Sequence, residues 1–189
     1  MKKIIVILCL FCALFTQKTL ADKPVYLGVQ AAKLNYSTNI LKQDFNSYAV
    51  FLKAGIPLHK FLALEARYGR GISKSEIKDT YYLQTPKEQT ISAKLNTLIG
   101  IYFAASLPVN NKLSLTGLLG YSQVDGRVKY DIPESFDSIL KSSGGPSIGI
   151  GLKYHIQPKV LLETEWTSYV SRKNNSSLGA VSGGLTYIF

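Results

Sequence analysis

The sequence predicts an all-β fold, an eight-stranded antiparallel β-barrel of the up-and-down kind, preceded by a cleaved export signal. Two observations lead to this prediction. Apolar and polar residues alternate with a period of two in one segment after another, which is typical of strands that bury one face. The connections between these segments are alternately short and long, so all the tight turns fall at one end of the sheet.

The composition limits the class of protein. The chain has 189 residues, enough for one domain. It is 46% hydrophobic but only 18% charged, against about 25% in an average soluble domain. Disordered, collagen-like and disulfide-rich chains are therefore excluded. The net charge of +10 would suit a nucleic-acid-binding protein, but the first residues argue against that class.

Residues 1–21 have the pattern of a secretory signal peptide. A pair of lysines precedes an apolar stretch at residues 4–15, and a small-residue cleavage site ends at Ala21. The apolar stretch is shorter than the roughly 20 residues of a membrane-spanning helix. Both cysteines lie inside this segment. We therefore expect a signal peptide at residues 1–21, a barrel domain at residues 22–189, and no binding of nucleic acid.

The first four strands are expected at residues 25–36, 48–56, 62–69 and 95–105. The alternation is weak in the first strand and clear in the other three. In the second, Val50 and Leu52 lie on the face opposite Lys53. In the third, Leu64 and Ala66 alternate with charged residues. In the fourth, aliphatic and aromatic residues fill one face.

The last four strands are expected at residues 113–124, 148–156, 162–166 and 178–189. The fifth has a weaker pattern. The sixth has the cleanest one, with Ile148, Ile150 and Leu152 opposite Lys153 and two glycines. The seventh sets apolar residues against two glutamates, and the eighth ends the chain on Phe189.

The connections sort by length. Short ones follow the second, fourth and sixth strands, at residues 58–60, 109–111 and 157–159. Long ones follow the odd strands, at residues 37–46, 72–91, 125–145 and 170–177. Barrels of bacterial outer membranes have short periplasmic turns and long outer loops, and strands of about 9–11 residues span the bilayer. The pattern therefore predicts a transmembrane barrel.

The two faces of the strands support a barrel whose apolar side is outside. The face opposite the apolar one is rich in glycine and carries charges in the middle of the strands, which suits a narrow lumen better than a wet exterior. The final strand places Leu185, Tyr187 and Phe189 on one face. A soluble barrel would instead point its apolar face inward.

Three segments resemble the small outer-membrane β-barrel family, which includes OmpA-type and OmpX-type barrels and opacity-like surface proteins. They are Val25-Tyr26-Leu27-Gly28-Val29-Gln30, Leu64-Glu65-Ala66-Arg67-Tyr68-Gly69 and Gly184-Leu185-Thr186-Tyr187-Ile188-Phe189. The resemblance implies location in the cell outer membrane of a Gram-negative bacterium and recognition of the terminal aromatic strand, with Tyr187 and Phe189, by the outer-membrane assembly machinery. Since the sequence ends at Phe189, we expect no peptidoglycan-binding domain like that of full OmpA-type proteins.

Six charged residues are expected to point into the lumen: Lys53, Glu65, Arg67, Lys153, Glu163 and Glu165. The turn at 58–60 would place Lys53 opposite Glu65, and the turn at 157–159 would place Lys153 opposite Glu163. Buried charges must be paired, and side chains just fill an eight-stranded lumen. We therefore expect a neutral plug that holds the barrel shut. A proton or ion path through the same residues is the alternative.

The sequence contains no constellation that suits catalysis, metal binding or a cofactor. Nucleophilic catalysis needs a base within hydrogen-bond reach of a nucleophile. His59 is expected in a solvated turn, and His155 on an inward face. The His-x-Ser pair of lipid A deacylase barrels is missing after both histidines. We expect a non-enzymatic protein without metal or cofactor.

The aromatic residues are expected to form a girdle where hydrocarbon meets headgroups. The residues assigned to this girdle are Tyr26, Tyr48, Tyr68, Tyr121, Tyr154, Trp166, Tyr187 and Phe189.

The long connections are the expected binding regions. In the third, Asp131 and Glu134 suit a helix start, and an apolar helical face would follow, formed by Ile132, Phe136, Ile139 and Leu140. The second is basic and carries Lys74, Lys78, Tyr81 and Tyr82, and the fourth carries Arg172 and Lys173. These residues are candidates for contact with lipopolysaccharide phosphates or an acidic host ligand.

The sequence thus predicts a non-enzymatic surface protein with a role in the structure of the envelope and with loops that bind or adhere. A narrow porin for ions or small solutes is the alternative. The expected partners are membrane lipid, lipopolysaccharide, the assembly machinery and a host surface ligand. We expect a monomer, because closure of the barrel removes free strand edges.

Overall fold

The computed structural model describes residues 24–38, 44–83, 85–132, 135–170 and 176–189. The predicted signal peptide lies outside these residues. The strands are β1 (Tyr26–Thr38), β2 (Asp44–His59), β3 (Leu62–Gly71), β4 (Ser75–Leu83), β5 (Thr85–Pro108), β6 (Leu113–Ile132), β7 (Ser135–Gln157), β8 (Val160–Val170) and β9 (Ser176–Ile188). In the described part of the chain, no helix is long and apolar enough to cross a membrane.

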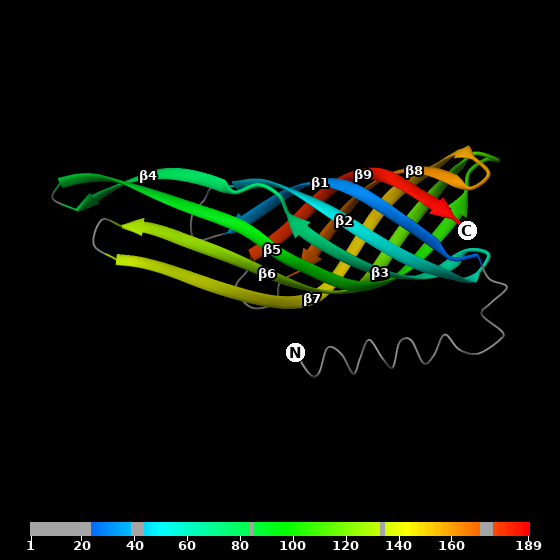
Figure 1. Cartoon of the computed structure of the whole chain (residues 1–189), viewed down its shortest axis with the longest axis horizontal. Helices are drawn as coiled ribbons and strands as arrows, with labels where there is room; N and C mark the ends of the chain where they lie inside the picture. Colours follow the sequence, from blue (N-terminus) through cyan, green and yellow to red (C-terminus); the bar gives the residue numbers. More distant parts are fainter. Residues whose placement is uncertain (1–23, 39–43, 84, 133–134, 171–175) are drawn as a thin grey trace.

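These strands form one closed antiparallel sheet (Figure 1). The order is β3-β2-β1-β9-β8-β7-β6-β5-β4, and an additional pairing of β3 with β5 closes it. β3 and β4 both pair with β5, one after the other along its length. β4 therefore continues along β5 from where β3 ends, beyond the barrel wall. The wall itself has eight strands, as predicted.

Tight turns gather at one end of the barrel. Residues 60–61, 109–112 and 158–159 connect neighbouring strands there. Asn110 stabilises the middle turn, because its side-chain oxygen accepts hydrogen bonds from the backbone of Lys112 and Leu113, each at 2.8 Å. Both ends of the described chain meet at this end as well, where the Phe189 amide donates to the Val25 carbonyl.

At the opposite end, two of the predicted long connections are formed largely by strands. The connection at 72–91 is largely the hairpin of β4 and β5, and the connection at 125–145 is the hairpin of β6 and β7 (Figure 1). The strands of the barrel wall continue outward as ladders that satisfy their backbone hydrogen bonds pair by pair.

The predicted amphipathic helix at residues 131–140 is therefore wrong. β6 reaches Ile132, β7 begins at Ser135, and these two residues pair. Residues such as Asp131, which suit the N-cap of a helix, indicate only a local conformational preference. The ladder between Val128 and Ile139 carries on from a barrel that already fixes the register, and this tertiary pairing overrides the local helical signals.

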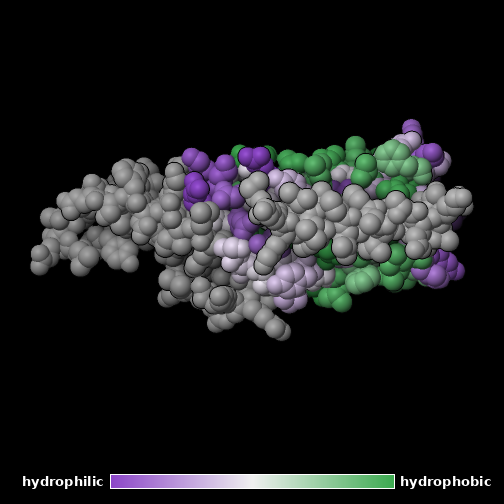
Figure 2. All heavy atoms as spheres, turned by 60° about the horizontal axis from the view of Figure 1, so that its bottom comes forward, coloured by the Kyte–Doolittle hydropathy of each residue, from purple (hydrophilic) through white to green (hydrophobic). Residues whose placement is uncertain are grey.

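The outside of the barrel is an apolar belt, which confirms the predicted inversion of faces. Figure 2 shows hydrophobic residues covering the part of the barrel nearest the short turns. The exposed residues of this belt include Leu27, Val29, Leu52, Ile99, Ile101, Phe103, Leu119, Ile148, Ile150, Leu152, Leu162 and Leu185. Exposed aliphatic side chains on every wall strand fit lipid as the surrounding solvent.

Candidate functional site

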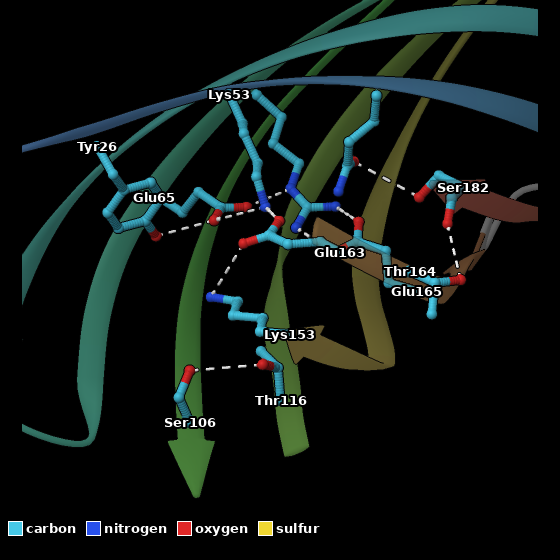
Figure 3. A network of polar contacts seen from close by, with 12 residues as sticks. Tyr26, Lys53, Glu65, Ser106, Thr116, Lys153, Glu163, Thr164, Glu165 and Ser182 are labelled. Carbon is cyan, nitrogen blue, oxygen red and sulfur yellow. Dashed lines mark hydrogen bonds and ion pairs between the residues drawn. The ribbon is translucent and has the colours of Figure 1, made fainter. Parts of the chain in front are cut away.

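The interior of the barrel contains the six charged residues singled out from the sequence. β2 supplies Lys53, and β3 supplies Glu65 and Arg67. β7 supplies Lys153, and β8 supplies Glu163 and Glu165. Strand alternation turns all six inward, because their neighbours along each strand face outward. We call this set the lumen network (Figure 3).

The lumen network is a chain of ion pairs with alternating signs. Its order is Lys153, Glu163, Lys53, Glu65, Arg67 and Glu165. Lys153 Nζ lies 3.8 Å from Glu163, whose other oxygen contacts Lys53. Glu65 lies 3.7 Å from Lys53 Nζ. The chain holds three cations and three anions, so it is neutral as a whole.

Arg67 makes the most directional contacts in the chain. Its Nε donates to Glu65 Oε1 at 2.5 Å, and both terminal nitrogens reach Glu165, one of them at 3.0 Å. The guanidinium also lies 4.9 Å from the ring centre of Tyr102. A planar fork that binds one carboxylate with two nitrogens is fixed in orientation as well as in charge.

One of the two predicted cross-strand pairs is correct. Lys153 lies directly opposite Glu163. Lys53 does not lie opposite Glu65 but opposite Arg67, and Glu65 faces Gly55. The turn after β2 is at residues 60–61, and the ladder shifts by one residue between Pro57 and His59, so the observed register differs from the predicted one by two positions.

Tyr26 belongs to the interior and not to the aromatic girdle, so its prediction was wrong. Its hydroxyl donates to Glu65 Oε2 at 2.8 Å, and Lys153 Nζ lies 5.6 Å from its ring centre. The ring occupies the space beside Gly55, where an added Cβ would be only 2.1 Å from it. The alternation within β1 could have predicted the inward position of Tyr26, because Tyr26 shares its face with Gln30 and its neighbour Leu27 faces lipid.

The other residues assigned to the girdle point outward. Tyr48, Tyr68, Tyr121, Tyr154, Trp166, Tyr187 and Phe189 are all exposed on the barrel surface. Tyr187 and Phe189 contact each other edge to face, with ring centres 4.9 Å apart.

A chain of hydroxyl groups lies beside the lumen network. Tyr102 contacts Ser122 at 2.5 Å, and Ser122 contacts Ser147 at 2.8 Å. The Tyr102 ring occupies space beside Gly100 and Gly120, where added Cβ atoms would be 2.7 and 2.5 Å from it. Gly100 on the same strand and Gly120 on the neighbouring strand therefore both leave space for the Tyr102 ring.

An apolar layer that was not predicted from the sequence lies in the lumen on the side of the hairpins. It is made by Leu34, Phe51, Leu95, Leu98, Tyr169 and Leu178, all buried. On β2, Phe51 lies beyond Lys53 toward the hairpin end, and on β8, Tyr169 lies beyond Glu165 in the same direction. Alternation places Phe51 on the same face as Lys53, but period alone does not show that such residues from distant strands meet.

The residues predicted for binding lie at the hairpin end where they are described. Lys74 is exposed between β3 and β4. Lys78, Tyr81 and Tyr82 belong to β4, Ile132 ends β6, and Phe136, Ile139 and Leu140 belong to β7. Arg172 and Lys173 lie outside the described residues.

The described residues contain no group of three or more His, Cys, Asp or Glu side chains that could hold a metal ion. His59 is exposed at the end of β2, and His155 is half-buried on β7. The two histidines lie at the turn end of the barrel.

A closed sheet with a polar, ion-paired interior and an apolar exterior defines a transmembrane β-barrel. The chain belongs to the family described as the outer membrane protein beta-barrel domain, which matches residues 5–189. The protein is therefore located in the cell outer membrane, and it is one of the small barrels of this kind, which are typically non-enzymatic.

Solved structures share this fold. The attachment invasion locus protein Ail of Yersinia pestis is 15% identical with a TM-score of 0.60, over 88% of this chain and 99% of that one. Neisserial surface protein A is 18% identical with a TM-score of 0.55, over 87% and 97%. OprG of Pseudomonas aeruginosa is 12% identical with a TM-score of 0.55, over 88% and 95%. No curated protein matches the sequence.

Proposed function

We propose that the protein is a closed, non-conducting barrel that contributes to the structure of the outer membrane and presents its extracellular hairpins for binding to a host surface ligand. The observation that carries this proposal is the contrast between the two parts of the molecule. The lumen is occupied by paired charges and apolar side chains. In contrast, two strand hairpins extend outward from the end of the barrel that lies opposite the short turns.

Closure of the lumen follows from two layers in series. An ion crossing the barrel would have to separate the ion pairs of the lumen network, which leaves buried charges without partners. It would then have to pass Phe51 and Leu98 in the apolar layer, where it would lose its hydration. The inward glycines do not widen this path, since the Phe51 ring lies within 2.1 Å of where a Cβ of Gly69 would be.

The hairpins are long enough to extend well beyond the membrane. β7 has 23 residues, and β6 has 20. A strand needs only about 9–11 residues to cross the hydrocarbon core. Short turns are periplasmic in bacterial outer-membrane barrels, so the hairpins are on the extracellular side.

The chemistry of the ligand is suggested by one relative in fold. The charge of the β4–β5 hairpin does not select a ligand, because Lys78 and Lys87 are matched there by Glu76, Asp79 and Glu88. Ail has been crystallised in complex with the heparin analogue sucrose octasulfate. A sulfated or otherwise acidic glycan is therefore the first ligand class to examine.

Two measurements test the proposal. In planar bilayers at neutral pH and high salt, the refolded protein is expected to give no discrete conductance steps. Reproducible steps would instead favour the narrow channel, with the lumen network as its selectivity lining.

The second measurement is binding of the intact protein to immobilised heparin. We expect binding to weaken when residues 77–91 are replaced by a two-residue turn, because the replacement removes the β4–β5 hairpin. The matched control is the same replacement at residues 128–139 in the β6–β7 hairpin. Equal binding by the intact protein and both variants would contradict a role for the hairpins.

A further inference from the structure

We propose that β7, where it extends beyond the barrel wall, is a docking site for the same segment of a second copy of this chain that is anchored in a facing membrane. The site is formed by residues 136–142, which we call the extended edge. Pairing of two extended edges would tether two cells. This function is separate from the binding of a host ligand, and it rests on the proposed function only for the extracellular placement of the hairpins.

Four strands continue beyond the barrel wall as an open sheet (Figure 1). The ladder of β3 with β5 ends at the pair of Gly69 with Leu98, and the ladder of β8 with β7 ends at the pair of Tyr169 with Ser147. Beyond these pairs, β4, β5, β6 and β7 form ladders only with one another in the described part of the chain. Closure of the barrel thus removes the edges of the wall, whereas β4 and β7 are the edges of the sheet outside it.

Of these two edges, β7 is the less protected against pairing with another strand. Natural sheets block such pairing with short edge strands, charged side chains and prolines. β4 has only 9 residues, and its charges are Glu76, Lys78 and Asp79. The longer part of β7 before Ser147 has the charges Asp137 and Lys141, and its proline, Pro146, lies next to the wall. A further strand can therefore add to the sheet along the extended edge.

The extended edge is complementary to itself. If two copies pair antiparallel with Ile139 opposite Ile139, Asp137 of each copy lies opposite Lys141 of the other. Opposite charges directly across a sheet attract each other, and like charges repel. A pairing centred on residue 137 or 141 would instead place two aspartates or two lysines opposite each other. The sequence therefore favours one register, in which the two copies form two ion pairs.

The charges of the neighbouring strand do not oppose Asp137 or Lys141. The partners of these two residues on β6 are Tyr130 and Gly126. The charged residues of this part of β6 are Asp125, Arg127, Lys129 and Asp131. Their partners on β7 are Ser142, Leu140, Ser138 and Phe136. Because successive residues of a strand alternate between faces, the charges of β6 belong to the other face of the sheet.

The direction of the strands decides where the second copy lies. In every copy β7 runs from the hairpin end of the barrel toward the short turns. Two copies in one membrane therefore hold β7 in the same sense, whereas antiparallel pairing needs opposite senses. The two copies must consequently be anchored in membranes that face each other. A twofold axis between the two Ile139 residues relates them, so the contact is isologous and closes as a dimer.

The extended edge is far enough from the barrel wall for such a contact. Residues 139–146 lie between the centre of the edge and Ser147, the last residue of β7 that pairs with β8. At a rise of about 3.3 Å per residue, this distance along the strand is about 26 Å. Two barrels that meet at Ile139 are therefore separated by two such lengths of strand.

The test exchanges charges between vesicles. Each protein is refolded into preformed phosphatidylcholine vesicles that carry one of two dyes, and tethering is measured as the fraction of particles that contain both dyes. The variants are Asp137→Lys and Lys141→Asp. The matched controls are Asp79→Lys and Lys78→Asp, which make the same changes of charge on β4, the other edge strand.

We expect wild-type vesicles to tether one another. Asp137→Lys alone and Lys141→Asp alone should each weaken tethering about tenfold, because both ion pairs become pairs of like charge. Mixing vesicles of these two variants should restore tethering, because a lysine then lies opposite an aspartate at both positions. The two β4 controls should tether like the wild type.

A second measurement locates the twofold axis. Both cysteines of the sequence lie in the predicted signal peptide, so Ile139→Cys introduces the single cysteine of the mature chain. Directly opposite residues of antiparallel strands are close enough for a disulfide. Oxidation of tethered vesicles should therefore give a covalent dimer with Ile139→Cys. It should give none with Ser142→Cys, whose counterpart in this register is Phe136.

Three results would overturn the proposal. They are absence of tethering by the wild type, absence of rescue in the mixture of Asp137→Lys with Lys141→Asp, and equal loss of tethering in the β4 controls, which would indicate pairing of β7 with β4 between copies. The hairpin replacements separate this proposal from the proposed function. Replacement of residues 128–139 should abolish tethering and keep heparin binding, and replacement of residues 77–91 should do the reverse.

Discussion

Glu65 contacts three side chains, two from the lumen network and one outside it. It accepts hydrogen bonds from Tyr26 and Arg67 and lies 3.7 Å from Lys53 Nζ. Its side chain is 0% exposed, so water cannot replace a lost partner. A buried carboxylate in this position matters mainly because its removal leaves two cations without their shared anion.

We expect Glu65→Gln to lower the free energy of unfolding by about 3 kcal/mol, because breaking a buried ion pair from one side leaves an uncompensated charge. The measurement is urea unfolding of the protein refolded in lipid vesicles. Asp125→Asn is the control, since Asp125 lies outside the network and should change stability by less than about 0.5 kcal/mol. A loss of the same size in both variants would show that the pairing of Glu65 contributes nothing.

Two glycines on opposite faces of the wall offer a second prediction at this scale. A Cβ at the interior Gly69 would lie 2.1 Å from the Phe51 ring, whereas a Cβ at Gly117, which faces outward, would meet nothing within 4 Å. Gly69→Ala should therefore lower stability by about 1–3 kcal/mol through overpacking, while Gly117→Ala should have little effect. The same unfolding measurement applies. Adding Phe51→Leu to Gly69→Ala should restore part of the loss, and no coupling between the two substitutions would contradict the overpacking explanation.

Alternation along a strand is what made these interior residues predictable. A period of two decides which residues of one strand share a face, so Lys53, Glu163 and the lipid-facing Leu52 could all be assigned from sequence. Tyr26 was misassigned because tyrosine is common at membrane interfaces, and this compositional preference was given more weight than its position in β1. The pairing of Arg67 with Glu165 could not be predicted, since Glu165 lies on β8, which is distant in sequence.

At the scale of elements, register and hairpin length were the hardest features to predict. The pair of Lys153 with Glu163 was correct because the assumed turn gave the right alignment. The pair of Lys53 with Glu65 was wrong because the turn after β2 falls at residues 60–61, later than the assumed 58–60. Both hairpins contain a one-residue register shift beside the turn, and the period-two pattern does not reveal where the turn itself falls.

The β6–β7 hairpin gives a prediction at the same scale. Replacing residues 128–139 by Asn-Gly, which suits a tight hairpin turn, should leave the unfolding free energy unchanged to within about 1 kcal/mol. Arg127 already pairs with Leu140, so the shortened ladder would close at an existing pair. Urea unfolding in vesicles provides the measurement. A loss of several kcal/mol would mean that the hairpin supports the barrel and does not merely extend from it.

At the scale of the whole molecule, charge is distributed according to the surroundings. Inside the barrel every cation of the lumen network lies beside a carboxylate, and the set is neutral. On the outside, Lys94 on β5 pairs directly with Arg127 on β6, and both side chains are exposed. The interior must balance its charges without help from solvent, whereas the exterior can use a charged leaflet as its partner.

The two layers of the lumen are built from different strands and lie in series. Each layer is therefore expected to keep the barrel closed without the other. We expect Lys53→Ala with Glu163→Ala to stay non-conducting in planar bilayers, because the apolar layer with Phe51 and Leu98 remains in series. Phe51→Ala with Leu98→Ala should also stay closed, because the lumen network remains. The combined quadruple variant should show discrete conductance steps, since no dry or ion-paired layer then crosses that side of the lumen. Steps in either double variant would mean that a single layer closes the barrel, and steps in the wild type would mean that neither does.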